Sequence, residues 1–444
     1  MNSGNTHKIH FLGIGGIGMS ALARYCRLMG REVSGYDRTA SVVTDALEKE
    51  GVKVYFEADV RHLEGAEMVV YTPAVPADHA ELVQARASGV PLLKRSQVLG
   101  AIGKSYQTLA VAGTHGKSTT SAMLTHLLRG AGVDATAFLG AISRNLESNF
   151  VFGHSPYMVA EADEYDRSFL TLHPWMAVIN SMDPDHLEIY GDEAGMKAGF
   201  LQFASQCERL LVHVSLAEEF TGREVMTFGI EQGDYHASHL RYEGLRTRFD
   251  FQGKGIIIKD IAVNMPGVHN VLNMSAALGV AVEAGADVSL LKAAAESFAG
   301  LYRRFEVHCH SERLTYIDDY AHHPAEIAAA IGAARALFPE RKLVVVFQPH
   351  LFTRTRDLCS GFAEELAQAD TLLLMDIYPA RELPIEGVSA QMLLDAMPAG
   401  DFSLVSRAAL TDEITLKLDR PTVLMTLGAG DIDREIERIK TCFC

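Results

Sequence analysis

Residues 108–120 read Thr-Leu-Ala-Val-Ala-Gly-Thr-His-Gly-Lys-Ser-Thr-Thr, an apolar strand that runs into a glycine-containing turn and a helix start. The usual phosphate-binding loop follows the pattern G-x-x-x-x-G-K-[ST], in which backbone N–H groups at a helix N-terminus surround phosphate oxygens. Val111 stands where the first glycine of that pattern belongs, so the strict pattern fails. Lys117 can still reach the β- and γ-phosphates of a nucleotide, and Ser118 can bind Mg²⁺. An ordinary strand-to-helix turn is the alternative, but the flanking strand and helix favour ATP binding.

The same order of apolar strand, turn and helix also begins at residues 9–12 and at residues 314–317. This alternation predicts mainly parallel sheets with helices on both faces. A chain of 444 residues is also too long for one hydrophobic core. The sequence therefore predicts an α/β protein with three domains: a Rossmann-like domain at 1–106, a P-loop ATPase-type domain at 107–305 and a second Rossmann-like domain at 306–444.

The apolar periodicity places further elements along the chain. Strands are predicted at 32–36, 68–71, 108–112, 157–160, 176–179, 209–214, 342–347, 371–375 and 422–427, and helices at about 20–29, 118–130, 270–284, 289–298 and 324–337. The alternating stretch 246–263 predicts an antiparallel hairpin added to the central sheet.

A glycine-rich turn, Gly13-x-Gly15-x-x-Gly18, follows the first predicted strand. It stands where a dinucleotide-binding fingerprint would, and Asp37 ends the second strand where an acid would bind ribose. The pattern favours a diphosphate site over a purely structural tight turn, and it leaves the identity of the nucleotide open.

Two acidic runs, residues 161–166 and 183–188, each follow a strand of the central region. If those strands neighbour residues 108–112, both runs lie at the carboxyl edge of the sheet, beside the phosphate loop. Carboxylates and an occasional imidazole there would suit Mg²⁺. The alternative for both runs is that their acids are solvated or cap helices. Asn270 stands at the start of a later predicted helix, and for it the alternative is a structural N-cap.

The third region carries Asp-Asp-Tyr-Ala-His-His-Pro at 318–324 and Gln-Pro-His-Leu-Phe-Thr-Arg-Thr-Arg at 348–356. Adjacent histidines cannot easily ligate one ion, and no third ligand stands at a useful spacing, so a zinc site is rejected. Polar and basic groups at strand ends suit anion recognition. A helix capped by Asp319 with surface arginines is the alternative.

Composition limits the class of protein. The net charge is −16, which argues against nucleic acid as a partner. No apolar run approaches the ~20 residues that span a bilayer, and no secretory signal is visible, so we expect a cytoplasmic protein without a membrane partner. The six cysteines predict neither a metal site nor a disulfide framework, and Cys442 and Cys444 are expected to be free thiols at a frayed end.

Taken together, these motifs resemble the Mur ligase family along the whole chain, and residues 113–119 match its form of the phosphate loop. The resemblance implies ATP and Mg²⁺ as cofactors, with Glu161 and His186 as a metal-binding pair beside Ser118. The ATP contacts that it implies are Gly113, Thr114, His115, Gly116, Lys117, Ser118, Thr119, His269, Asn270, Asn273 and Arg304.

Residues 13–20 and the third-region motifs resemble the alanine-adding branch of the family, whose first domain holds UDP rather than a dinucleotide. The implied contacts to the UDP substrate are Gly13, Gly15, Gly16, Ile17, Gly18, Met19, Ser20, Asp37 and Arg95. The implied reaction is bacterial peptidoglycan precursor synthesis: ATP phosphorylates the carboxylate of UDP-N-acetylmuramate, and L-alanine attacks the acyl phosphate. The implied catalytic residues are Lys117, Glu161, His186, His322, Arg354 and Asp319.

Three positions qualify the resemblance. Glu188 replaces the usual aspartate, and Leu351 stands where an arginine is common, although Arg354 is retained and Arg356 could compensate. Lys197 is given no carbamylated role, in line with the alanine-adding branch. A recycling ligase that joins a murein peptide to the same nucleotide sugar is the nearest alternative. A dinucleotide-dependent oxidoreductase and a non-enzymatic regulator are more distant ones, and a monomer or homodimer is expected.

Overall fold

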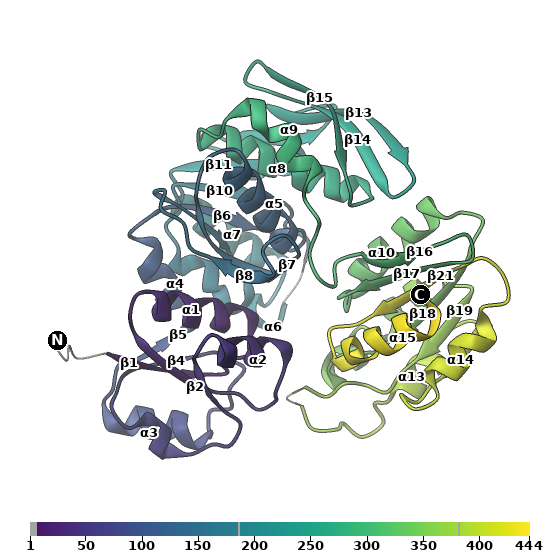
Figure 1. The fold of residues 1–444 in the computed structure, drawn as a ribbon, viewed down its shortest axis with the longest axis horizontal. Helices are drawn as coiled ribbons and strands as arrows, with labels where there is room; N and C mark the ends of the chain where they lie inside the picture. Colours follow the sequence, from purple (N-terminus) through teal and green to yellow (C-terminus); the bar gives the residue numbers. More distant parts are fainter. Residues whose placement is uncertain (1–6, 185–186, 381) are drawn as a thin grey trace. The chain divides into compact units, whose positions relative to one another are not determined.

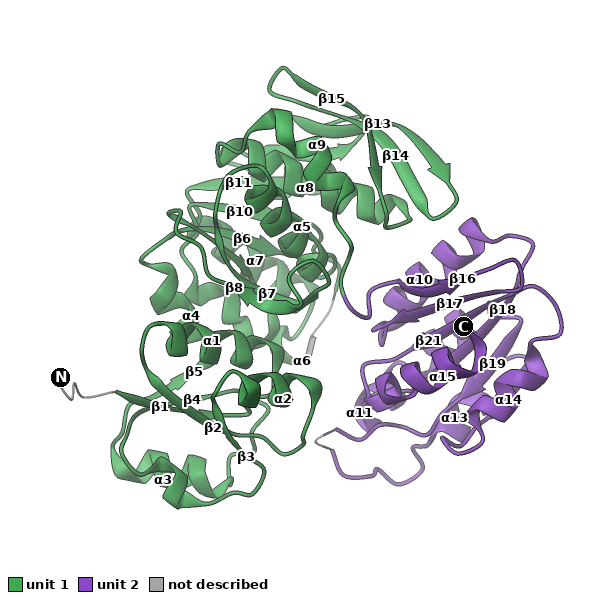
Figure 2. Cartoon of the chain, viewed as in Figure 1, with its two compact units in different colours: residues 1–301 green, residues 302–444 purple. Residues whose placement is uncertain are grey.

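The computed structural model describes residues 7–184, 187–380 and 382–444 (Figure 1). The chain divides into two compact units. Unit 1 comprises residues 1–301 and unit 2 comprises residues 302–444 (Figure 2). Strands and helices alternate in both units, and the sheets are mainly parallel. The predicted α/β class is confirmed.

The N-terminal part of unit 1 forms a parallel sheet of order β3-β2-β1-β4-β5. Its strands are β1 (Lys8–Leu12), β2 (Glu32–Tyr36), β3 (Lys53–Tyr55), β4 (Ala66–Tyr71) and β5 (Leu92–Lys94). Its helices are α1 (Ile17–Leu28), α2 (Val42–Lys49), the 3₁₀ helix η1 (Val60–Leu63), α3 (Ala80–Ser88) and α4 (Arg95–Gly103). The chain reverses its direction of winding at β1, so the turn after β1 opens at the crevice where such sheets bind ligands.

The second sheet of unit 1 has the order β15-β14-β13-β12-β11-β10-β6-β9-β7-β8. Its strands are β6 (Gln107–Ala112), β7 (Thr136–Ser143), β8 (Ser148–Val151), β9 (Tyr157–Glu161), β10 (Met176–Ile179), β11 (Arg209–His213), β12 (Met226–Ile230), β13 (Tyr235–Glu243), β14 (Arg246–Gly253) and β15 (Ile256–Val263). Its helices are α5 (Lys117–Gly130), η2 (Tyr165–Thr171), α6 (Leu187–Tyr190), α7 (Glu193–Ser205), η3 (Val214–Phe220), α8 (Val268–Glu283) and α9 (Val288–Glu296).

Strand β6 lies between β10 and β9 and is parallel to both. The predicted neighbourhood is therefore confirmed: the phosphate loop after β6 and the segments after β9 and β10 leave the sheet at the same edge. The predicted hairpin is also confirmed, since β14 and β15 pair antiparallel, and β13 joins them.

One hydrophobic core connects the two sheets of unit 1. Phe11 and Leu22 from the first sheet region share a buried cluster with Phe138 and Phe200 from the second. Asn149 of β8 adds polar contacts, because its side-chain amide donates to the carbonyl of Ile17 and to Ser20 Oγ. The turn after β1 is thus held in one body with the phosphate loop.

Unit 2 contains a third sheet of order β16-β17-β21-β18-β19-β20, in which only the β16–β17 pairing among the described strands is antiparallel. Its strands are β16 (Glu306–His310), β17 (Leu314–Asp319), β18 (Lys342–Phe347), β19 (Thr371–Leu374), β20 (Asp401–Leu404) and β21 (Thr422–Leu427). Its helices are α10 (Pro324–Leu337), α11 (Phe352–Asp357), α12 (Cys359–Leu366), α13 (Ala390–Asp395), α14 (Leu410–Lys417), η4 (Asp431–Glu435) and α15 (Ile436–Phe443).

The end of the chain differs from the expectation of a frayed segment with free thiols. Residues Ile436 and Ile439 are buried, so α15 packs as an amphipathic helix and carries the terminus to the edge strand β16. There Cys444 forms a disulfide with Cys309, with the two Cα atoms 5.8 Å apart. The predictions of a free Cys444 thiol and of no disulfide are wrong, whereas Cys442 is an exposed free thiol.

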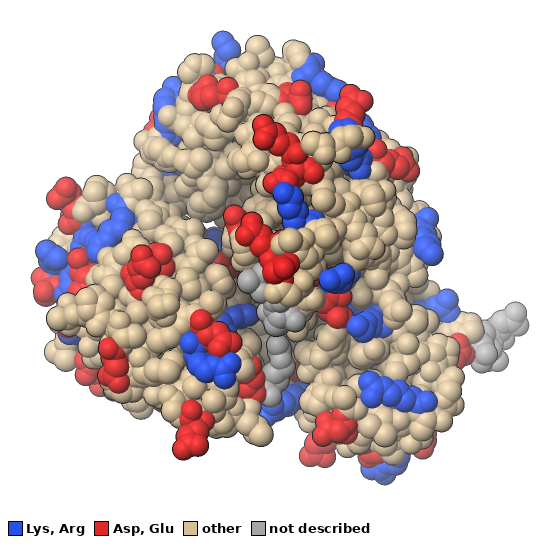
Figure 3. Space-filling view, turned by 180° about the vertical axis from the view of Figure 1, so that it is seen from behind, with Lys and Arg blue, Asp and Glu red and all other residues tan. Residues whose placement is uncertain are grey.

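Charges on the surface are mixed in sign. On the face drawn in Figure 3, acidic and basic side chains are interspersed, and neither sign forms one continuous area. Within residues 7–184, 187–380 and 382–444, no helix has both the length and the apolar character needed to cross a membrane.

Candidate active site

The phosphate loop joins β6 to α5, and its two glycines take backbone conformations that other residues rarely adopt. Gly113 has φ +129° and Gly116 has φ +79°. A Cβ at Gly116 would lie 2.5 Å from Asn273 Oδ1 and 2.7 Å from Asn180 Nδ2, so a larger residue cannot fit. Helix α5 begins directly after this turn, at Lys117. Its N-terminus therefore offers the N–H groups and the dipole end that attract an anion.

Polar side chains from neighbouring elements fix the loop. The His115 N–H donates to Ser181 Oγ at 3.0 Å, and Asn180 Nδ2 donates to Thr120 Oγ1 at 3.0 Å. Thr120 Oγ1 in turn donates to Asn273 Oδ1 at 3.1 Å, which places one predicted ATP contact, Asn273, at the loop. Asn180 and Ser181 were not predicted. Their signal in the sequence is their position directly after β10, at the edge of the sheet that carries the loop.

Lys117 is folded back over its own loop. Its Nζ donates to the Gly113 carbonyl at 2.7 Å and to Glu164 Oε1 at 2.7 Å. Burial lowers the pKa of the Lys117 amine, but attraction to Glu164, Asp163 and Glu161 outweighs burial and raises it, so the amine remains an ammonium. The Glu164 side chain is 1% exposed, and burial raises the pKa of its carboxyl group. Glu164 belongs to the acidic run predicted at 161–166, but the sequence did not single it out.

Glu161 and Ser118 offer hard oxygen donors beside the loop. Glu161 ends β9, and Ser118 lies in the first turn of α5. Gly140 of β7 leaves room for the acid, because a Cβ there would overlap the Glu161 carboxylate. Carboxylate and hydroxyl oxygens suit Mg²⁺, which takes its remaining ligands from water and phosphate. The described residues contain no cluster of three or more acidic, histidine or cysteine side chains that could hold a metal without such ligands.

Two other predicted positions near the metal pair cannot be placed. His186 lies outside the described residues, as does the side chain of Glu188. Lys197 of α7 forms an ion pair with Glu219.

His269 and Asn270 lie in the first turn of α8. The helix is capped by Gly267, which has φ +99°, so the alternative that Asn270 is the N-cap is wrong. Asn270 instead lies inside the helix and donates from Nδ2 to the Pro266 carbonyl at 2.8 Å. His269 is exposed, whereas Asn270 is buried.

The glycine-rich turn after β1 is held by β2 and Asp37. Gly13 has φ +84°, and its N–H donates to the Tyr36 carbonyl at 2.8 Å. The Gly15 N–H donates to Asp37 Oδ2 at 2.7 Å, so Asp37 contacts the turn directly. Further along, the side chains of Met19 and Ser20 are buried and face the core. Among the predicted UDP contacts, Gly13, Gly15, Gly16, Ile17 and Gly18 form the turn and the start of α1.

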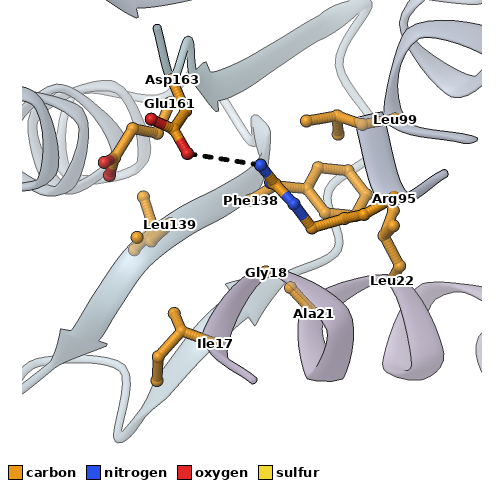
Figure 4. Close-up of a pocket in the computed structure, with 11 residues that line it drawn as sticks. Ile17, Gly18, Ala21, Leu22, Arg95, Leu99, Phe138, Leu139, Glu161 and Asp163 are labelled. Atoms are coloured by element: carbon orange, nitrogen blue, oxygen red, sulfur yellow. Dashed lines mark hydrogen bonds and ion pairs between the residues drawn. The ribbon is translucent and has the colours of Figure 1, made fainter. Parts of the chain in front are cut away.

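A cavity of about 110 Å³ lies between this turn and the acids that follow β9. Helices α1 and α4, strand β7 and the segment after β9 line it (Figure 4). Arg95, the first residue of α4, crosses the cavity, and its Nη2 lies 3.5 Å from Asp163 Oδ2. A Cβ at Gly18 would lie 2.8 Å from Arg95 Nη1, so the guanidinium packs directly on the glycine turn. Arg95 therefore connects the turn after β1 to the acidic run beside the phosphate loop.

In unit 2, Asp319 lies at the carboxyl end of β17 and is partly buried. Its carboxylate accepts hydrogen bonds from the N–H groups of Phe305 at 2.6 Å and Ala321 at 2.8 Å. Burial raises the pKa of Asp319 to about 6. Helix α10 is capped by His323, so the alternative that Asp319 caps this helix is wrong. The extended cap residue His323 lies four positions beyond Asp319, and the helix begins at Pro324.

His322 lies close to Glu326, an acid in the first turn of α10. Its Nδ1 is 3.0 Å from the Tyr320 carbonyl and 3.2 Å from Glu326 Oε2. Burial lowers the pKa of His322 and favours the neutral ring. Arg304 Nη1 is 3.8 Å from Glu326 Oε1, and the Arg304 guanidinium lies 5.3 Å from the centre of the Tyr320 ring. Glu326 was not predicted, although it follows the motif at 318–324 by two residues.

Arg354 lies on the short helix α11, which begins after Leu351. Leu351 is buried and has φ +73°. Arg354 makes no side-chain hydrogen bond or ion pair with any residue that the structure describes. Arg356 donates from Nε to Asp357 Oδ1 at 2.7 Å and is half exposed, so its role in replacing an arginine at position 351 stays a prediction.

Three family models match the chain in order. Residues 8–107 match the Mur ligase family catalytic domain, residues 111–281 match the Mur ligase middle domain, and residues 303–430 match the Mur ligase glutamate ligase domain. These matches cover well over half of the sequence. The chain belongs to the Mur ligase family.

The relatives of this Mur ligase extend over its whole length. It is 44% identical to the UDP-N-acetylmuramate–L-alanine ligase of Flavobacterium johnsoniae, over 99% of this chain and 98% of the relative. The crystal structure of the UDP-N-acetylmuramate–alanine ligase of Thermotoga maritima is 30% identical, with a TM-score of 0.84 and coverage of 97% and 98% of the two chains. The murein peptide ligase of Psychrobacter arcticus, at 24% identity, shares the fold with a TM-score of 0.74 over 98% of each chain.

Proposed function

We propose that this Mur ligase uses ATP to join the amino group of L-alanine to the carboxylate of UDP-N-acetylmuramate. The observation that carries the proposal is the full-length similarity to a ligase of that name, at 44% identity over 99% of the chain. The geometry supports it, because an ammonium, a helix N-terminus and a group of acids meet at one edge of the second sheet. Such an enzyme would act in the cytoplasm on small molecules in peptidoglycan precursor synthesis, as a monomer or homodimer.

We assign one role to each predicted domain. Residues 1–106 would bind the UDP moiety through the turn after β1, where Asp37 contacts Gly15 and Arg95 packs on Gly18. Residues 107–305 would bind ATP through the phosphate loop, and residues 306–444 would bind the amino acid. Arg304, at the end of the central segment, would contact ATP.

The first chemical problem is that a carboxylate is a poor electrophile. Transfer of the γ-phosphoryl group of ATP to a carboxylate oxygen gives an acyl phosphate with a good leaving group. Two anions must approach each other in line, so catalysis rests on positioning and on neutralising charge. Lys117 and the N–H groups of α5 would supply positive charge to the phosphates, with His269, Asn270 and Asn273 as further ATP contacts.

The oxygen donors beside the loop fit a divalent cation, and Ser118, Glu161 and His186 would hold Mg²⁺. Bound there, Mg²⁺ would neutralise charge on the phosphate oxygens. Its selection over softer ions follows from the oxygen-rich donor set.

The second problem is that an ammonium has no lone pair with which to attack. Because burial keeps His322 neutral, this ring can hold a proton from the amine, while Arg354 and Asp319 orient the amino acid. The free amine then attacks the acyl carbon, and the tetrahedral intermediate collapses to the amide with release of phosphate. Exclusion of water from the acyl phosphate would favour the amine over hydrolysis.

The decisive test is release of ADP from ATP with UDP-N-acetylmuramate and a panel of acceptors. We expect release with L-alanine, and weaker release or none with glycine, with L-serine and with the tripeptide L-alanyl-γ-D-glutamyl-meso-diaminopimelate. Release with the tripeptide alone would identify a recycling ligase instead. Release with no acceptor would contradict both assignments, and mass spectrometry of the nucleotide sugar would identify the product.

A further inference from the structure

The ammonium of Lys117 is paired with Glu164, an acid to which the proposed reaction gives no role. Its ammonium contacts the Gly113 carbonyl and Glu164 Oε1, each at 2.7 Å. An ammonium with two short contacts to its own protein has little freedom to reach a phosphate. These two contacts use two of the three N–H donors of the ammonium and direct it toward Glu164, so a phosphate that draws Lys117 forward competes with this contact.

The carboxylate of Glu164 has fewer hydrogen bonds than a purely structural buried acid normally has. Its side chain is 1% exposed, yet Oε2 has no hydrogen-bond partner among the residues that the structure describes. Buried carboxylates in structural networks normally have both oxygens paired, because an unpaired buried oxygen is costly. The contact to Lys117 is thus the main compensation that Glu164 receives.

The backbone around Glu164 is fixed more firmly than its side chain. The Glu164 carbonyl accepts from the Tyr190 hydroxyl at 2.7 Å and from the Arg167 N–H at 3.0 Å. Asp166 and Arg167 both have positive φ, near +52° and +54°, which is rare in succession for residues other than glycine. Asp166 is in turn held by Lys94, with the ammonium 2.7 Å from its carboxylate. This strained turn points Glu164 at Lys117.

We propose that Glu164 is a positioning residue that holds Lys117 in the nucleotide-free enzyme and releases it when the β- and γ-phosphates of ATP arrive. The inference rests on the proposed ATP site. It makes Glu164 a competitor of the phosphates for the same ammonium, so Glu164 lowers nucleotide affinity and allows ADP to leave after the reaction. A structural ion pair that persists in the complex would have the opposite effect, because its loss would misplace Lys117 and weaken binding.

The test is the dissociation constant of three nucleotides, measured by isothermal titration calorimetry on the full chain with Mg²⁺ and without the other substrates. In Glu164→Gln the competing carboxylate is lost while its shape is kept. We expect the imidotriphosphate analogue of ATP to bind about tenfold more tightly, since a hydrogen bond to a charged group is among the stronger ones. ADP should tighten less and AMP not at all, because Lys117 does not reach an α-phosphate.

Three further variants control the measurement. In a Lys117→Met background, Glu164→Gln should change the affinity by less than about twofold, because the two side chains then share no interaction. Asp166→Asn breaks the contact to Lys94 but keeps a residue type that tolerates positive φ, so the turn and the Lys117–Glu164 contact should persist and the ratio of triphosphate to AMP affinity should stay unchanged. Glu164→Asp keeps the charge but shortens its reach, and should tighten the triphosphate less than Glu164→Gln does.

The outcomes separate the inference from the proposed function. Unchanged or weaker triphosphate binding in Glu164→Gln overturns the positioning role, as does equal tightening of AMP. If Glu164→Gln fails to give a native circular dichroism spectrum, the Glu164→Asp variant decides by the same criterion. A wild-type protein that binds neither ATP analogue nor ADP contradicts the ATP site itself.

Discussion

Two buried carboxylates of unit 1, those of Glu81 and Glu164, have opposite environments. Glu81 on α3 has both oxygens paired: Oε2 lies 2.9 Å from His10 Nε2, and Oε1 lies 3.1 Å from His62 Nδ1 and accepts from the Asp59 N–H at 3.0 Å. Glu164 is equally buried, but only Oε1 is paired, with Lys117, among the described residues. The first acid is enclosed by a complete hydrogen-bond network, and the second is not.

The difference separates a structural site from a functional one. A complete buried network stabilises one arrangement, because any change leaves a polar group unpaired. An incomplete network leaves a charged group whose partner can change at modest cost. The Glu81 network therefore should influence stability, whereas the Lys117–Glu164 pair should influence nucleotide binding and turnover.

The largest effect is expected for Lys117→Met. Loss of the ammonium removes positive charge from the transferred phosphoryl group, so alanine-dependent ADP release should fall on the order of 10⁴-fold. A coupled assay for ADP measures it. The matched control is the double variant Lys117→Met/Glu164→Gln, which removes both charges and avoids an uncompensated buried acid. It should be equally inactive and should retain the native circular dichroism spectrum; turnover near the wild-type rate in either protein would show that Lys117 does not contact ATP.

Breaking the complete network should instead reduce stability. Glu81→Ala removes the carboxylate that His10 and His62 share, and it leaves the Asp59 N–H without its acceptor. Removal of one member of a buried charged network costs about 3–5 kcal/mol of unfolding free energy. Urea denaturation followed by circular dichroism measures the change. Turnover well below the unfolding transition should stay within a factor of about two of wild type, and a large loss of turnover in folded protein would mean that the network reaches the reaction.

A variant of Glu161 tests whether this acid holds Mg²⁺, and we expect a smaller effect on turnover than for Lys117→Met. Replacing a carboxylate ligand by an amide in Glu161→Gln removes a charge that attracts Mg²⁺. The Mg²⁺ concentration for half-maximal turnover should rise about 10- to 100-fold. The Mg²⁺ titration of Glu164→Gln serves as the control, because Glu164 is proposed to act on Lys117 rather than on the metal. Identical titrations for Glu161→Gln and wild type would show that Glu161 does not hold the ion.

Much of the second sheet could be predicted from the sequence because its signals are local. A strand, a glycine turn and a helix define the phosphate loop, and parallel strands bring the following acids to one edge. The identity of the acid that meets Lys117 could not be predicted. It depends on the positive φ angles of Asp166 and Arg167, a conformation that is enriched in aspartate but uncommon in any residue other than glycine, so the sequence does not predict it.

Long-range packing explains the other gaps. The cavity next to Arg95 forms where α4 meets β7 and the end of β9, segments separated by dozens of residues. Likewise the disulfide of Cys444 depends on where α15 packs, and Cys309 stands 135 positions away. Sequence spacing does not predict contacts between such distant segments, so the cavity and the disulfide could be identified only from the structure.

The smallest effect, and the sharpest test of the complete network, is its pH dependence. Burial lowers the pKa of His10 despite its contact with Glu81, and hydrogen bonds to His10 and Asp59 outweigh burial and lower the pKa of Glu81. For both groups the folded state binds fewer protons than the unfolded state, so unfolding free energy falls as pH falls below about 6.5, the ordinary pKa of histidine.

His10→Gln removes the histidine and leaves Glu81 as the titrating group of the pair. The unfolding free energy of this variant should be lower than that of wild type at pH 8, but it should fall less steeply between pH 7 and pH 5. Ser34→Ala is the matched control, because it removes the 2.9 Å contact to His10 Nδ1 and keeps the titrating ring. It should lose about 1 kcal/mol at every pH and retain the wild-type slope. Urea midpoints across this pH range measure all three proteins. Parallel curves for His10→Gln and wild type would mean that His10 keeps the same affinity for protons in both states, and that the Glu81 network stabilises the fold through hydrogen bonds alone.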